Sequence, residues 1–169
     1  MLVHQLIYQG HRDKVAFRGP VDITYGQLQS AVDLYRRYLH HAGVRPGENV
    51  GLLLRNSPSF VYAYMAIVSL GAVVVPINYQ LTAFEVAYIV KDAGIKNLII
   101  AVPLDLAAPL AEHDHTAAVA QHTVAAIEAF IPPPGAADPP GDEQLTEDRP
   151  CTIIYTSGTT GNPKGAILT

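Results

Sequence analysis

The sequence contains only one cysteine, Cys151, among its 169 residues. A lone thiol cannot form an internal disulfide, so the disulfide-stapled class of small secreted domains is excluded and a reducing compartment is favoured. Residues 1–10 contain no basic segment followed by an apolar stretch, and no secretory signal is predicted. We therefore expect a cytoplasmic protein in which Cys151 packs as a small hydrophobic residue.

Basic residues are scarce as well: the chain has eleven Lys and Arg but fifteen Asp and Glu, and its formal net charge is −4. This balance excludes a protein that binds a nucleic acid backbone or an anionic membrane surface through a basic patch. Residues 101–169 form the acidic part, with two basic residues against nine acidic ones. No nucleic acid partner is predicted.

Long apolar segments are also missing. The most apolar stretch, residues 62–77, is too short for a comfortable membrane span and is interrupted by Gly71 and Pro76. It predicts a buried helix followed by a buried strand, with no transmembrane segment. Because 49% of the residues are hydrophobic, the chain can still bury the core of one compact domain.

Three predicted helices carry start and stop signals that agree with their apolar periodicity. Each begins with a capping serine or threonine and ends at a glycine. They are expected between Thr24 and Gly43, between Ser57 and Gly71, and between Thr82 and Gly94.

Short apolar runs at residues 50–54, 73–77 and 98–102 separate these helices. They show no alternation, as expected of strands that are covered on both faces. Helical crossovers join successive strands in parallel and with right-handed geometry. Residues 44–102 therefore predict an α/β fold, a doubly wound and mainly parallel sheet with flanking helices. Upstream, residues 15–18 and 21–24 indicate a short hairpin.

The rest of the chain is less regular. Residues 104–130 are rich in alanine and predict helix, and five prolines between positions 132 and 140 predict a linker. A fourth short strand is expected at residues 152–155. The predicted division is an N-terminal α/β subdomain (1–102), a helical segment with an acidic linker (103–150), and a strand with the loop that follows it (151–169).

Residues 155–165 follow this strand directly and read Tyr-Thr-Ser-Gly-Thr-Thr-Gly-Asn-Pro-Lys-Gly. Glycines let backbone N–H groups approach anionic oxygens, hydroxyls donate further hydrogen bonds, and Lys164 adds a positive charge, so this composition suits phosphate. It is not a Walker A motif, because Pro163 precedes the lysine and Gly165 follows it. From composition alone, a flexible surface turn is an equally good interpretation.

The order of these residues resembles the signature YTSGTTGxPKG of the adenylate-forming superfamily, which includes acyl-CoA synthetases, peptide-synthetase adenylation domains and firefly-type luciferases. Two further segments are similar to the first subdomain of an acyl-CoA synthetase-like N-terminal domain, namely GVRPGENVGLLLRNSPSFVYAYMAIVSLGAVVVPIN and LTAFEVAYIVKDAG. The resemblance implies an AMP-forming acid–thiol ligase. A carboxylic acid, with a fatty acid as the first choice, would react with ATP and Mg²⁺ to give an acyl-adenylate, from which coenzyme A would displace AMP.

The resemblance also assigns the site residues. In this family the signature loop wraps the departing β- and γ-phosphates, which implies nucleotide binding by Thr156, Ser157, Gly158, Thr159, Thr160, Gly161 and Lys164. Lys164 is expected to contribute to catalysis through its charge and position. Asn162 occupies the variable position of the signature, and Tyr155 is expected to anchor the end of the strand and not to contact ATP.

Two other kinds of site are disfavoured. The histidines at 113, 115 and 122 match neither the spacing of a helical zinc-protease pair nor that of a cysteine-assisted zinc module. A solvated polar helix face explains them, and no metal site is predicted. Ser157 lacks the Gly-x-Ser-x-Gly pattern of a hydrolase nucleophile, because Tyr155 and Thr159 stand at the glycine positions.

Two alternatives to a CoA ligase stay open: a free-standing phosphate-binding module and a peptide-synthetase adenylation domain. We expect the gene to continue past Thr169 from a strand-to-helix connection, because in the family the adenine and acyl pockets lie further along the chain. The 169-residue piece by itself is expected to be inactive. Its exposed apolar surface would favour self-association.

Overall fold

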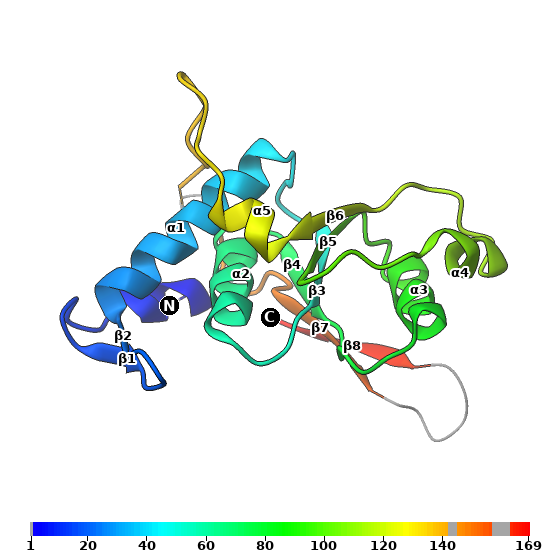
Figure 1. Cartoon of the computed structure of the whole chain (residues 1–169), viewed down its shortest axis with the longest axis horizontal. Helices are drawn as coiled ribbons and strands as arrows, with labels where there is room; N and C mark the ends of the chain where they lie inside the picture. Colours follow the sequence, from blue (N-terminus) through cyan, green and yellow to red (C-terminus); the bar gives the residue numbers. More distant parts are fainter. Residues whose placement is uncertain (1, 142–144, 157–162) are drawn as a thin grey trace.

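The computed structural model describes residues 2–141, 145–156 and 163–169. They form a six-stranded sheet with helices on both faces and a separate two-stranded sheet (Figure 1). The small sheet pairs β1 (Val15–Phe17) with β2 (Ile23–Thr24) in antiparallel fashion, which confirms the predicted hairpin. The α/β class is confirmed as well.

The large sheet has the strand order β6-β5-β3-β4-β7-β8. Its neighbours from β6 to β7 are parallel, and only the last pair, β7 and β8, is antiparallel. The parallel strands therefore end at one common edge, which we call the carboxyl edge. In chain order the strands are β3 (Asn49–Leu53), β4 (Val73–Pro76), β5 (Asn97–Ile100), β6 (Ala120–Thr123), β7 (Thr152–Thr156) and β8 (Lys164–Leu168).

The three predicted helices begin with the expected caps. Thr24 and Thr82 each accept a hydrogen bond from the backbone N–H three residues later, and Ser57 does so in front of Pro58. These three helices are α1 (Tyr25–His41), α2 (Pro58–Ser69) and α3 (Ala83–Asp92). The described residues also form the 3₁₀ helix η1 (Val3–Tyr8) and the short helices α4 (Ala107–Glu112) and α5 (Val124–Glu128).

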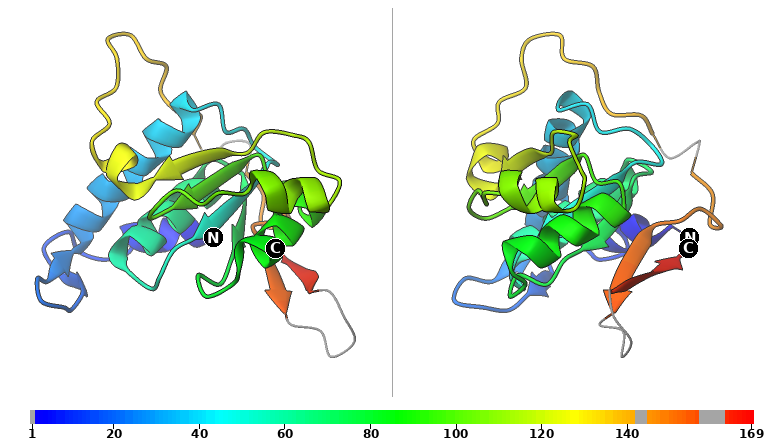
Figure 2. Two further views of the ribbon diagram at one scale, coloured as in Figure 1. Left: turned by 45° about the vertical axis from the view of Figure 1, so that its right-hand side comes forward. Right: turned by 90° about the vertical axis from the view of Figure 1, so that its right-hand side faces the viewer.

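Alternate residues of the central strands point into two separate cores. Val50 and Leu52 pack with α1 and α2, whereas Leu53 and Leu98 pack with α3 and α4. The two helix layers enclose the sheet from opposite sides (Figure 2). Both faces of the central strands β3, β4 and β5 are thus buried, which is why their sequences are almost continuously apolar.

The segment 104–130 differs from the predicted helix. Residues 107–112 and 124–128 are helical, but Ala120–Thr123 form β6 and pair in parallel with β5. The helical prediction is wrong for these residues, because pairing with β5 outweighs the local preference of alanine. As a result, His122 is a buried side chain of the edge strand β6 and does not lie on a solvated helix face.

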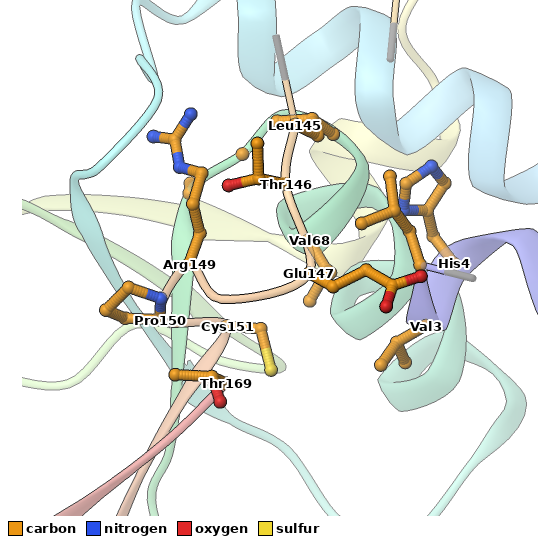
Figure 3. Close-up of a pocket in the computed structure, with 13 residues that line it drawn as sticks. Val3, His4, Val68, Leu145, Thr146, Glu147, Arg149, Pro150, Cys151 and Thr169 are labelled. Carbon is orange, nitrogen blue, oxygen red and sulfur yellow. The ribbon is translucent and has the colours of Figure 1, made fainter. Parts of the chain in front are cut away.

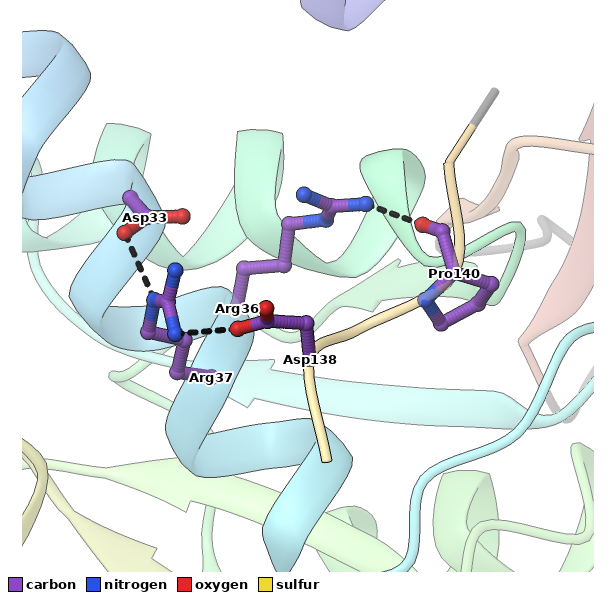
Figure 4. Close-up of polar contacts among 5 residues, drawn as sticks. All are labelled: Asp33, Arg36, Arg37, Asp138 and Pro140. Carbon is purple, nitrogen blue, oxygen red and sulfur yellow. Dashed lines mark hydrogen bonds and ion pairs between the residues drawn. The ribbon is translucent and has the colours of Figure 1, made fainter. Parts of the chain in front are cut away.

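The proline-rich residues 131–141 form no helix or strand, and in Figure 1 this segment loops out from the body of the fold after α5 and returns toward α1. Figure 4 shows how α1 holds them: Arg37 donates to Asp33 at 2.8 Å and to Asp138 at 2.5 Å, and Arg36 donates to the Pro140 carbonyl oxygen. Such exposed ion pairs contribute little to stability. They fix the path of the linker over α1.

Candidate functional site

Strand β7 brings the signature residues to the carboxyl edge of the sheet. It pairs in parallel with β4 through Val74 and Thr152 and ends at Thr156, and β8 begins at Lys164. Ligands of open α/β sheets bind outside the carboxyl ends of the strands. Of the predicted site residues, Thr156 and Lys164 are described, whereas Ser157, Gly158, Thr159, Thr160 and Gly161 lie outside the described residues.

The structure brings Thr156 and Lys164 together. They are direct partners in the antiparallel pairing of β7 with β8, so their side chains project from the same face of the hairpin. Both residues are exposed. A hydroxyl group and an ammonium group thus lie side by side, open to solvent, where the signature loop leaves the sheet.

The opposite face of the hairpin is closely packed. Tyr155 pairs with Gly165, and a Cβ atom on Gly165 would lie 2.8 Å from Ile153 Cγ2 and 3.2 Å from Tyr155 Cζ. A side chain there would have to displace the Ile153 methyl group and would crowd the tyrosine ring. This close approach explains why the signature ends in glycine.

Helix α3 contacts the hairpin on both sides of the signature loop, at Tyr155 before it and at Pro163 after it. Tyr155 donates its hydroxyl hydrogen to the Asp92 carboxylate at 2.5 Å, and Tyr88 donates to the Pro163 carbonyl oxygen at 3.5 Å. Burial raises the pKa of Tyr155, and the hydrogen bond to Asp92 raises it further. The expected anchoring role of Tyr155 is confirmed. The contacts that Asp92 and Tyr88 make with the hairpin were not foreseen, although these two residues are four positions apart and so share one helix face.

The segment after the signature corrects one expectation. A strand-to-helix connection was predicted there, but Lys164–Leu168 form the strand β8. The prediction was wrong because antiparallel pairing with β7 decides the conformation of this segment. The signature thus connects two strands, whereas a Walker A motif leads into a helix.

The histidine-rich segment shows no metal site. Among the described residues, no three His, Cys, Asp or Glu side chains are grouped so that they could hold a metal ion. His113 lies at the end of α4, with its ring 4.2 Å from that of Phe84 and its Nε2 3.0 Å from the Phe84 carbonyl oxygen. His113 thus packs against the ring and backbone of Phe84 in α3.

His122 is held as a neutral ring inside the fold. Its Nε2 lies 2.9 Å from Asn97 Oδ1 and its Nδ1 lies 3.1 Å from Tyr38 Oη. Asn97 Oδ1 can only accept, so Nε2 carries the proton and Nδ1 accepts from the tyrosine. Burial lowers the pKa of His122.

Because the folded state binds the second ring proton, on Nδ1, less readily than the unfolded chain does, protonation of His122 is expected to lower the stability at acidic pH. The contribution of His122 is complete above the unfolded pKa of about 6.5 and is lost as the pH falls below that value. Urea unfolding at pH 7.5 and pH 5.5 should show a smaller pH dependence for His122→Gln, which keeps a donor and an acceptor but does not titrate. An equal pH dependence in both proteins would contradict this assignment.

Two of the cavities among the described residues lie at opposite edges of the sheet. A cavity of 240 Å³ at the amino edge is lined by η1, the end of α2 and residues 145–151, with Thr169 at its rim (Figure 3). Half-buried Cys151 is part of its lining. A larger cavity of 720 Å³ lies at the carboxyl edge beyond Leu53 and Ile100. Only the second cavity shares an edge with Thr156 and Lys164, so the first is no candidate for their ligand.

The mainly parallel sheet and the signature sequence that follows β7 point to the adenylate-forming class of proteins. The family model described as AMP-binding enzyme matches residues 5–169, and the chain therefore belongs to this family. It is 36% identical over 155 residues to a feruloyl-CoA synthase from an Amycolatopsis species, covering 89% of this chain. It is also 36% identical over 167 residues to a long-chain-fatty-acid–CoA ligase of Mycobacterium tuberculosis, covering 88% of this chain.

The structure resembles that of O-succinylbenzoate coenzyme A synthetase from Bacillus subtilis in complex with AMP. The TM-score is 0.79 at 26% sequence identity, and the match covers 96% of this chain and 40% of that one. The chain spans only 29% and 30% of the two curated relatives named above. In the described part of the chain, no helix is both long enough and apolar enough to cross a membrane.

Proposed function

We propose that this chain supplies the phosphate-binding part of an ATP-dependent carboxylate–CoA ligase. The observation that carries the proposal is the β7–β8 hairpin, which leaves the carboxyl edge at Thr156, returns at Lys164, and has the complete adenylate-forming signature at residues 155–165. The names of the relatives favour coenzyme A as the acceptor thiol.

The reaction has two steps. A carboxylate oxygen bonds to the α-phosphorus of MgATP, and the bond from that phosphorus to the α,β-bridging oxygen breaks, so that its electron pair leaves with pyrophosphate. The thiolate of coenzyme A then bonds to the acyl carbon, and AMP leaves with the electrons of the acyl–oxygen bond. Negative charge develops on the departing pyrophosphate in the first step only.

We assign stabilisation of that charge to Lys164, with Thr156, Ser157, Gly158, Thr159, Thr160 and Gly161 as the other nucleotide-binding residues. Because a strand and not a helix follows Lys164, no helix N-terminus is available next to it. The ammonium group, the hydroxyls and the backbone N–H groups would have to supply the positive potential by themselves. Lys164 is the one cationic side chain of the signature, and we therefore assign it the catalytic role on this chain.

Acid-dependent exchange of labelled pyrophosphate into ATP tests the proposal. A protein in which this chain is continued by its natural downstream sequence should exchange with one class of acid from a panel of fatty, aromatic and short acids, and should form an acyl-CoA thioester once coenzyme A is added. The 169-residue chain should stay at background, because it spans about 30% of its relatives.

Each contrary result has a separate meaning. Clear exchange by the 169-residue chain would contradict the assignment of the remaining machinery to residues beyond it. Adenylate formation followed by transfer to a carrier-protein thiol, and not to coenzyme A, would favour a peptide-synthetase adenylation domain. Binding of pyrophosphate without exchange by the longer protein would favour a phosphate-binding module.

A further inference from the structure

The half of the β7–β8 hairpin next to the signature loop has no registered backbone pairing with β4 in the described part of the chain. Within the described residues, β7 pairs with β4 only through Thr152, at the end of the strand remote from the loop. Residues 153–156 pair with β8 alone. The position of Thr156 and Lys164 therefore also depends on side-chain contacts, which include the packing of Ile153 and Tyr155 against the core under α3.

Two side chains of α3 make such contacts. Asp92 accepts from the Tyr155 hydroxyl on β7, and Tyr88 donates to the carbonyl oxygen of Pro163, which directly precedes β8. One helix thus contacts both strands, and each contact is one residue away from a predicted phosphate-binding residue. A carboxylate at the C-terminus of a helix is locally unfavourable, so the tertiary contact and not helix stability accounts for Asp92.

We infer that Asp92 and Tyr88 are positioning residues. By holding the loop end of the β7–β8 hairpin against α3, they fix the position of Thr156 and Lys164 relative to the sheet. This inference rests on the proposed function, because its consequence is a preorganised site for the outer phosphates of ATP. Hydrogen bonds aimed at a bound anion are effective only when their donors are held in place before binding. Neither side chain needs to touch the nucleotide.

Hydrogen exchange of backbone amides, measured by NMR on the 169-residue chain, tests the inference without any ligand. Tyr155→Phe and Asp92→Ala should each accelerate exchange at residues 153–156 and 164–167 by about fivefold or more, the effect expected for losing one hydrogen bond to a charged group. Exchange in α1 and β3 should be unchanged. Asp92→Asn should behave nearly as wild type, because its amide oxygen still accepts from the tyrosine.

Tyr64→Phe is the matched control, since the Tyr64 hydroxyl lies 2.6 Å from Thr152 Oγ1 at the opposite end of the same strand. It should lower the melting temperature without the local acceleration next to the loop. Unchanged exchange in both Tyr155→Phe and Asp92→Ala, or an equal acceleration throughout the chain, would overturn the inference.

A second readout separates this inference from the proposed function. Affinity for magnesium pyrophosphate should fall about fivefold in Asp92→Ala and recover in Asp92→Asn. A wild-type chain that does not bind pyrophosphate would count against the proposed function, while the exchange data would still decide the positioning role. Wild-type binding that survives Asp92→Ala unchanged would overturn the positioning role alone.

Discussion

Replacing Lys164 with alanine in the proposed ligase is expected to slow acyl-adenylate formation by about 10- to 1000-fold, the range found when one positioned charge or donor is removed from a developing anion. The thioester-forming step, started from pre-formed acyl-adenylate, should change much less, because no pyrophosphate takes part in it. Single-turnover rates of the two half-reactions provide the measurement, and their ratio is the decisive quantity.

Two further variants test whether the effect depends on the charge of Lys164 and on its position. Lys164→Arg should restore activity only in part, since a planar guanidinium on a longer side chain places its charge elsewhere. Lys96→Ala is the matched control, because Lys96 is also exposed but directly precedes β5 at the amino edge of the sheet. Equal losses in both half-reactions of Lys164→Ala would mean that the residue acts through folding or domain position, and its phosphate role would be dropped.

The parts of the fold that were predicted correctly are those with local signals. The caps at Thr24 and Thr82 are formed by residues three positions apart, and the buried strands are recognisable from their own apolar runs. The side chains that decide these elements are therefore their sequence neighbours. A helix or strand can be predicted from the sequence where the contacts that stabilise it lie within the same short segment of the chain.

The elements that were missed depend on distant partners. Residues 120–123 read Ala-Gln-His-Thr and have no apolar run, so their strand conformation comes from pairing with β5. Strand β8 likewise depends on β7, across the signature loop. For the site, the motif identified Lys164, but the contacts of Asp92 with Tyr155 and of Tyr88 with Pro163 join residues 63 and 75 positions apart. No local pattern encodes such pairs.

Leu52→Ala is expected to be the most damaging change to stability among the predictions made for this chain. Leu52 lies in the central strand β3, is fully buried, and packs in the core between the sheet and the layer of α1 and α2. Truncation removes buried apolar surface and leaves a cavity between rigid elements, which costs about 2–5 kcal/mol of unfolding free energy and lowers the melting temperature by roughly 5 to 15 °C. Val21→Ala is the control, since Val21 is 77% exposed and its truncation should change stability by less than about 0.5 kcal/mol. Urea titrations of the three proteins provide the comparison, and a Leu52→Ala midpoint equal to that of Val21→Ala would mean that the two-layer core does not contribute to stability as the structure indicates.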